Sequence, residues 1–183
     1  MKILYIIFFV AVFTATGCSA EPKTITGTVM DAGTGQPVEG AVVLVEWTKA
    51  EGMPGLTSTK SYKVVEAVTD RDGKFSIEDV KKVLIDSPDV TVYKKGYVAW
   101  SSRWIFPDWR NRTDFKWGKT NIFKLEHFKP EYSYDKHVSF ISSSTNSSLG
   151  IEKPLIRKAY RWEELNAASE LSEVWRKQKE QSK

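Results

Sequence analysis

The stretch that decides the fold is "TITGTVMDAGTGQPVEGAVVLVEW", residues 24–47. Its opening residues alternate, with Ile25 and Val29 on one face and threonines on the other, which is typical of a strand with one buried side. Residues 32–40 are dense in Gly, Pro and polar side chains and predict a turn. Residues 41–47 are rich in β-branched side chains and predict a strand that is buried on at least one face. The stretch therefore predicts two strands joined by a turn.

Further short strands follow along the chain. The string "DRDGKF", residues 70–75, is a hairpin signal because Asp-Gly tolerates a positive φ. Phe75 and Ile77 then alternate inward, and Ile122 and Leu125 mark a last strand. Because turns separate these strands and no helical pattern lies between them, the sequence predicts an all-β, antiparallel sandwich.

Four short motifs resemble a known family. They are G-x-V, P-V-x-G-A-x-V, T-D-x-D-G-x-F and K-x-G-Y, which begin at Gly27, Pro37, Thr69 and Lys94. Their identity and order resemble the carboxypeptidase regulatory-like domain over residues 23–126. The resemblance implies a seven-stranded Greek-key β-sandwich of the transthyretin-like, immunoglobulin-like type. It also implies an accessory module without catalysis of its own, as found beside zinc carboxypeptidases and at the amino end of outer-membrane transporters.

The amino-terminal residues 1–17 have the pattern of a signal peptide. Lys2 supplies a positive charge, an apolar run follows, and small residues precede Cys18, the only cysteine. The apolar run is too short to span ~30 Å of hydrocarbon as a helix. The string "ATGC" ending at Cys18 resembles the lipobox of bacterial lipoproteins, which implies cleavage before Cys18 and acylation of its thiol and amino group. Residues 18–22 would then be a lipidated tether; the alternative is a secretory peptide cut near Ala20.

Several functional classes are excluded or disfavoured. The resemblance to bacterial lipoproteins implies a lipid-anchored protein of the cell envelope. If the organism is Gram-negative, it also implies that Ser19 permits sorting to the outer membrane, facing the periplasm. The net charge is +4 and the charges are interspersed, so nucleic acid is not an expected partner. With Cys18 acylated, no thiol remains for a disulfide or a thiolate metal site. No catalytic signature is present, so we expect no enzyme, no cofactor and no metal.

An aromatic insertion occupies residues 98–118. The family connection is usually shorter here, and tryptophan faces stack on sugars and cations while arginines bind carboxylates. These properties predict a binding surface for a glycan or cell-wall ligand; the alternative is a second small core. The candidate ligand-binding residues are Trp100, Arg103, Trp104, Trp109, Arg110 and Trp117.

Residues 127–157 show no regular pattern and are interpreted as an irregular segment. Two Tyr and two His lie close together at its start, and such a set resembles in composition the ferric-iron ligands of intradiol dioxygenases, whose fold is a related sandwich. The histidine spacing differs from that family, so an edge strand with its loop is the favoured alternative. The four residues are His127, Tyr132, Tyr134 and His137.

The carboxyl-terminal residues 158–180 predict an amphipathic helix. Apolar side chains recur every three or four residues from Trp162 to Trp175. The helix either packs on the sandwich, docks a partner or rests on a membrane surface, and its glutamates argue against an anionic membrane.

Together these features predict a non-catalytic, lipid-anchored envelope module for binding or scaffolding. A protein partner is the favoured ligand. A glycan bound by the tryptophan-rich insertion is the alternative, and an iron-dioxygenase-like enzyme is a remote one.

Overall fold

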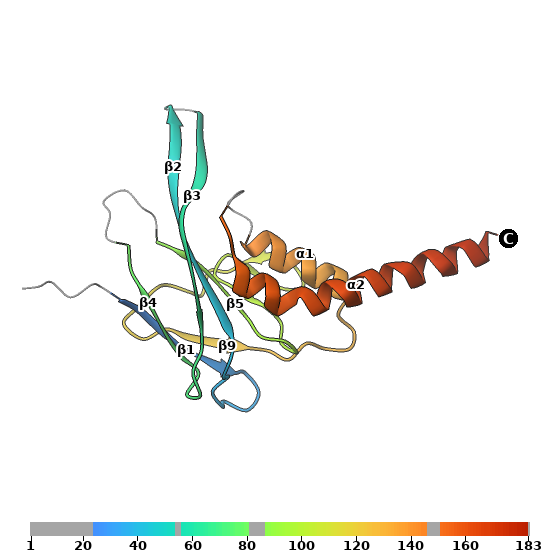
Figure 1. Cartoon of the computed structure of the whole chain (residues 1–183), viewed down its shortest axis with the longest axis horizontal. Helices are drawn as coiled ribbons and strands as arrows, with labels where there is room; N and C mark the ends of the chain where they lie inside the picture. Colours follow the sequence, from blue (N-terminus) through green and yellow to red (C-terminus); the bar gives the residue numbers. More distant parts are fainter. Residues whose placement is uncertain (1–23, 54–55, 81–86, 146–150, 183) are drawn as a thin grey trace, which may run out of the picture.

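The computed structural model describes residues 24–53, 56–80, 87–145 and 151–182, and shows two sheets, a small hairpin and two helices (Figure 1). In chain order the elements are β1 (Thr24–Asp31), β2 (Val42–Met53), β3 (Leu56–Val68), β4 (Lys74–Glu78), β5 (Asp89–Tyr93), β6 (Trp100–Ser101), β7 (Trp104–Ile105), β8 (Arg110–Asn111), β9 (Ile122–Leu125), α1 (Tyr134–Thr145) and α2 (Pro154–Gln181).

The strands form one sheet of order β4-β1-β9 and another of order β3-β2-β5-β6, with β7 and β8 apart as a hairpin. The expected class, a β-sandwich with a carboxyl-terminal helix, is confirmed. Two details differ from the expectation. The described strands number nine rather than seven because the insertion forms β7 and β8, and β9 runs parallel to β1, with Thr28 opposite Ile122 and Asp31 opposite Leu125.

The first core lies between the two sheets. Val43, Val45 and Trp47 of β2 face it, together with Phe75 and Phe123 from the opposite sheet. Gly27 of β1 is required at this point, because a Cβ atom there would lie 2.7 Å from the ring of Phe75 and 2.8 Å from that of Phe123. The alternating pattern of β1 therefore has a glycine at an inward position so that two aromatic rings can approach the backbone.

A second core lies on the other face of β2. Val42 and Leu44 point away from the sandwich and pack, with Tyr93 of β5, against Phe140 of α1 and Ile156 of α2. Residues 42–47, Glu46 included, are consequently buried without interruption, which explains why apolar side chains occupy both faces of the strand from Val42 to Val45. The two helices thus form a third layer on the outer face of the β3-β2-β5-β6 sheet (Figure 1).

Helix α1 corrects the interpretation of residues 127–157 as irregular. Its buried side chains include His137, Phe140, Ile141 and Ser144, which recur at helical spacing. The helical signal in the sequence is weak, because serine and β-branched residues have low helix propensity. Tertiary packing on the sheet, rather than propensity, therefore determines this helix.

Glutamates from other elements cap both helices. Helix α2 begins at Pro154, four residues before the predicted start, and its first free N–H groups, on Leu155 and Ile156, donate to the Glu66 carboxylate of β3 at 3.0 and 2.8 Å. Glu170 of α2 accepts hydrogen bonds from the backbone N–H groups of Tyr134 and Asp135 at the start of α1. Each helix end that needs acceptors is thus satisfied by a distant residue.

A buried polar chain fastens the helices to the sheet. The Nε2 atom of His137 accepts from the Ala99 backbone N–H at 2.9 Å, so Nδ1 carries the proton and donates to Glu163 at 2.6 Å. The second oxygen of Glu163 accepts from the Tyr93 hydroxyl at 2.8 Å, and that hydroxyl accepts from the Trp162 indole. Burial, followed by the charge of Glu163, raises the pKa of Tyr93, so its hydroxyl remains a donor.

A second polar cluster joins the end of β1 to the K-x-G-Y motif. The Asp31 carboxylate accepts from the backbone N–H groups of Gly33 and Thr34, each at 2.8 Å, and from the Tyr97 hydroxyl at 3.0 Å. His127 lies 2.7 Å from the same carboxylate and stacks on the Tyr97 ring. These hydrogen bonds lower the pKa of Asp31 to about 2. The bond from the Thr34 backbone contributes most, and those from Tyr97 and Gly33 add to it. Tyr97 of the K-x-G-Y motif thereby holds the turn after β1.

We predict that Glu163→Ala lowers the free energy of unfolding by about 3 kcal/mol, because it leaves the buried Tyr93 hydroxyl and His137 Nδ1–H without an acceptor. Glu164→Ala changes an exposed neighbour on the same helix and is expected to alter stability by less than about 0.5 kcal/mol. Urea unfolding followed by circular dichroism measures both. Equal stabilities of the two variants would show that the buried chain contributes nothing.

We also predict a pH-dependent contribution from Asp31. Because folding lowers its pKa from 3.8 to about 2, its carboxylate stabilises the fold fully above the unfolded-state value, and this contribution is lost as the pH falls toward 2. Asp31→Asn should therefore be less stable than the wild type at pH 7, with the difference shrinking steadily below pH 4. A difference that stayed constant from pH 6 to pH 3 would refute this assignment.

Candidate functional site

The lipidation site predicted at Cys18 lies outside the described residues. Across the ranges that the structure does describe, none of the helices combines the length and the apolar character needed to cross a membrane. Membrane attachment through Cys18 therefore stays a prediction from the sequence.

The structure separates the six candidate ligand-binding residues into two groups. Trp100 and Trp117 belong to the first group and pack into the sandwich core with Phe115 and Phe123, at centroid distances of 4.9–6.2 Å. The Trp117 indole also donates to the backbone carbonyl of Pro88 at 2.6 Å. These two rings belong to the sandwich core itself rather than to a separate small core within the insertion.

The second group lies on the β7–β8 hairpin. Trp104 and Trp109 contact each other at 5.8 Å, and Trp109 packs on Phe140 of α1 at 5.2 Å. Arg103 stacks on Trp104 at 4.2 Å, whereas Arg110 is exposed beside Asp108. Trp109 remains 40% exposed and adopts a φ of 58°, which is unusual for so large a side chain. The hairpin therefore offers one exposed tryptophan, Trp109, beside a half-buried Trp104 on which Arg103 stacks, rather than a row of open faces for a glycan.

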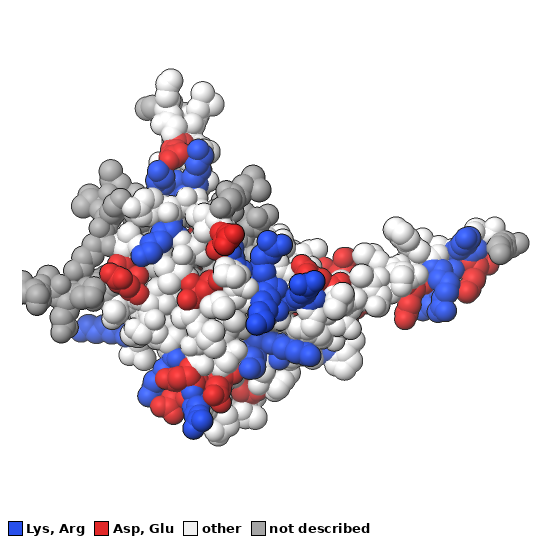
Figure 2. All heavy atoms as spheres, viewed as in Figure 1, with Lys and Arg blue, Asp and Glu red and all other residues white. Residues whose placement is uncertain are grey.

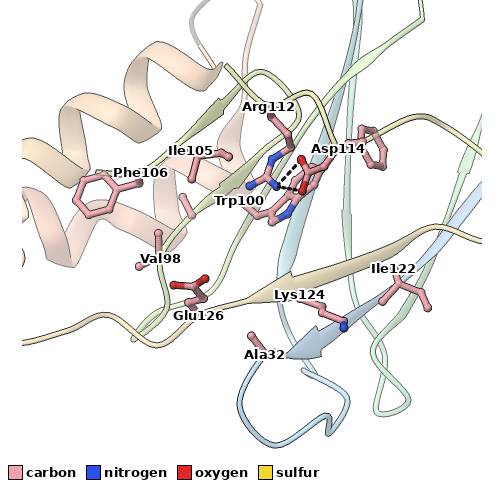
Figure 3. A pocket seen from close by; sticks show the side chains of 12 residues that line it. Ala32, Val98, Trp100, Ile105, Phe106, Arg112, Asp114, Ile122, Lys124 and Glu126 are labelled. Carbon is pink, nitrogen blue, oxygen red and sulfur yellow. Dashed lines mark hydrogen bonds and ion pairs between the residues drawn. The ribbon is translucent and has the colours of Figure 1, made fainter. Parts of the chain in front are cut away.

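A cleft of about 380 Å³ opens between the insertion and the edge strand β9 (Figure 3). Arg112 forms one wall: its guanidinium stacks on Trp100 at 4.3 Å, its Nε donates to the Ser101 carbonyl at 2.7 Å, and it pairs with Asp114. Lys124 and Glu126 lie across the cleft from it (Figure 3). The stacked guanidinium covers a face of Trp100 and therefore takes the place that a sugar ring would need.

Arg112 was not among the predicted ligand-binding residues. Burial lowers its pKa, and Asp114 opposes this effect. Arg112 forms a wall of the cleft because its guanidinium stacks on Trp100. These two positions are 12 residues apart, and the sequence does not indicate that they are in contact. The cleft is consequently walled by a fixed Arg–Trp stack and by charges of both signs, and nothing in its geometry singles out a ligand class.

The four residues of the iron-ligand comparison are not brought together as a metal site. His127 pairs with Asp31, whereas His137 is enclosed on α1 and bound to Glu163. Tyr132 and Tyr134 pack on Phe128. Within the described ranges, no group of three or more His, Cys, Asp or Glu side chains could hold a metal ion. The segment that was interpreted as an edge strand with its loop contains a short bridge at His127 and then the start of α1.

The most distinctive surface is the distal half of α2. The helix has 28 residues, about 42 Å at 1.5 Å per residue, and its last turns project well beyond the body of the molecule (Figure 1). Its buried residues end with Ala167, and Glu170 accepts a hydrogen bond from the start of α1. Beyond that point Leu171, Val174 and Trp175 are 44%, 48% and 72% exposed.

These exposed side chains continue a pattern that is buried in the proximal half. Leu171 and Val174 lie four and seven residues after Ala167, which places them on the same side of the helix. An apolar stripe that packs on the sheet and on α1 at one end is therefore bare at the other end. Such a stripe with exposed Leu, Val and Trp is typical of a helix that enters a partner's groove.

The carboxypeptidase regulatory-like domain matches residues 24–115 of the chain. Among curated proteins, none matches this sequence. Among solved structures, a Streptococcal ancillary pilin shares 16% identity and a TM-score of 0.30, with 59% of this chain and 30% of the pilin chain covered. A 9R-lipoxygenase from Cyanothece PCC8801 shares 18% identity and a TM-score of 0.29, with 60% of this chain and 17% of the lipoxygenase covered.

This chain spans less than a third of either solved protein. The family match carries more weight, because it includes all four sequence motifs and agrees with the observed β-sandwich. It fits a non-catalytic β-sandwich module. Since the match covers half of the sequence, the protein belongs to the carboxypeptidase regulatory-like domain family.

Proposed function

We propose that this protein is a non-catalytic binding module of the cell envelope, anchored by lipid at Cys18, that docks a protein partner on the distal half of α2. The observation that carries the proposal is the bare apolar stripe of Leu171, Val174 and Trp175 on a projecting helix. A polypeptide suits this surface because an amphipathic helix presents side chains at i, i+3 and i+4 to a groove of matching shape.

The anchoring of α2 supports this role. Glu66 fixes its first turn, the Glu163 chain fixes its middle, and Glu170 joins it to α1. The distal half therefore extends from a rigid base, so that little orientational freedom is lost when a partner binds. A helix that served only to cover the sheet could end near Glu170.

We predict that the double substitution Leu171→Ser and Trp175→Ser reduces partner capture at least tenfold, because large buried side chains, and tryptophan above all, supply most of the binding free energy at interfaces. Cross-linking in intact cells followed by affinity purification measures the capture. The melting temperature should not change, since both side chains lie beyond the packed part of the helix.

The matched control is Glu173→Ser with Lys177→Ser, which has the same spacing on the same projecting segment but lies on another side of the helix. It should leave capture intact. Undiminished capture by the Leu171→Ser, Trp175→Ser variant would contradict docking through the stripe.

The lipid anchor gives a separate prediction. Cys18→Ser should move the protein from the membrane pellet to the soluble fraction, because each buried CH₂ of an acyl chain contributes ~0.8 kcal/mol to membrane binding. Ser19→Ala, which keeps the thiol, should remain in the pellet. A Cys18→Ser protein that still pelleted with membranes, or a wild type that failed to incorporate radiolabelled palmitate, would exclude the lipoprotein assignment.

A further inference from the structure

A groove of about 660 Å³ runs beside the first turns of α2 and is lined largely by charged side chains. Figure 2 shows Lys and Arg side chains gathered over this part of the molecule. The groove-lining residues are Glu152, Lys153, Pro154, Arg157, Lys158, Arg161 and Glu164. The groove therefore has more cations than anions at its surface.

Three of these cations form no ion pair with a carboxylate among the described residues. Lys153 differs from them, because it is buried and faces Glu46 and Glu66, while burial lowers its pKa. Arg157, Lys158 and Arg161 are exposed, and no ion pair links any of them to a carboxylate in the ranges that the structure describes. An arginine pair four residues apart on a helix presents two planar guanidinium groups side by side, which suits carboxylates that can accept two hydrogen bonds each.

Arg157 and Arg161 of the groove lie in one row on α2 with two residues of the stripe, Leu171 and Trp175, whereas Val174 lies beside this row, toward the packed side of the helix. Steps of four, three, four, three and four residues lead from Arg157 to Trp175, so all six positions lie along one side of the helix. All six are exposed. The row consists of Arg157, Arg161, Glu164, Ala168, Leu171 and Trp175. One end of the row is therefore cationic and the other end is apolar.

We infer that the groove at Arg157 and Arg161 binds a carboxylate-rich segment of the same protein partner whose apolar surface covers Leu171 and Trp175. This inference rests on the proposed function and adds the chemistry and the direction of the partner. The acidic segment lies against the start of α2, and the apolar part lies toward its carboxyl end. A partner that met only the distal stripe would leave the unpaired arginines unexplained.

A polypeptide fits the row better than a lipid surface does. The occupant must supply anionic groups and apolar side chains along one line, about 27 Å from Arg157 to Trp175 at 1.5 Å per residue. Glu152 and Glu164 lie on the groove itself and would be repelled by a continuous anionic membrane, whereas a peptide can place its carboxylates between them. The row therefore selects a partner with a defined order of side chains.

The test uses the full chain carrying Cys18→Ser, so that no acyl chain contributes to binding. The probe is a fluorescent peptide that joins an oligo-glutamate half to a leucine-rich helical half, and its matched control has glutamine in place of every glutamate. Fluorescence anisotropy should show binding of the glutamate peptide that weakens as ionic strength rises. The double reversal Arg157→Glu with Arg161→Glu should weaken this binding at least tenfold.

Lys116→Glu with Lys119→Glu is the matched reversal: both lysines are exposed, lie outside the groove and change the net charge equally. It should leave the affinity within about twofold of the parent chain, since distant exposed charges are screened. Equal binding of the glutamine peptide, or an unchanged affinity after the Arg157/Arg161 reversal, would overturn the inference. Binding of phosphatidylglycerol vesicles through these two arginines, without peptide binding, would overturn it in favour of a membrane.

Failure of this inference is distinguishable from failure of the proposed function. Capture in cells that depends on Leu171 and Trp175 but survives the arginine reversal would keep the docking helix and exclude the acidic segment. Peptide binding that depends on Arg157 and Arg161, with capture that is indifferent to Leu171 and Trp175, would keep the anion-binding groove but exclude its link to a partner on the stripe.

Discussion

The buried carboxylate of Glu163 is the interaction on which the helical layer depends. A carboxylate can be removed from water only where hydrogen-bond donors replace its hydration, and here His137 and Tyr93 supply them. These donors come from α1 and β5, and Glu163 itself belongs to α2. One carboxylate therefore sets the position of both helices on the outer face of the sheet, with a precision that apolar packing alone does not impose.

The placement of this chain of hydrogen bonds has a consequence for α2. Glu66 of β3 binds the first turn of α2, and Glu163 and Glu170 of α2 form its hydrogen bonds to the sheet and to α1. All of these hydrogen bonds lie in the first 17 of its 28 residues. The apolar stripe does not stop where the ties stop, because Leu171, Val174 and Trp175 continue it. Exposure of these apolar side chains to water is unfavourable, and a partner that covered them would remove this unfavourable contribution. The proposed docking surface is accordingly the part of α2 that the fold leaves unpacked.

Much of the sandwich follows from the sequence. The alternation of residues 24–31, the Asp-Gly turn and the four family motifs predict its strands, and Asp70 indeed accepts backbone hydrogen bonds from Asp72 and Lys74 in that turn. What the sequence could not show are contacts between distant positions. The continuously buried residues 42–47 of β2 require a helical layer on the second face of the strand, yet these residues alone do not identify the helices that supply it. Glu163 appears in the sequence as one more glutamate of a polar helix, although it is fully buried.

The aromatic insertion is a second case in which the sequence does not reveal contacts between distant positions. Tryptophan-rich composition is equally compatible with a ligand platform and with a core, and only the packing of Trp100 and Trp117 around Phe123 distinguishes the two. The family match ends at residue 115, so β9 of the sandwich and both helices lie beyond the matched residues. A shared sandwich core specifies stability, whereas a surface built from added elements can differ between proteins of one family. If α2 docks a partner as proposed, the choice of that partner should depend on the exposed side chains of α2 rather than on the sandwich beneath it.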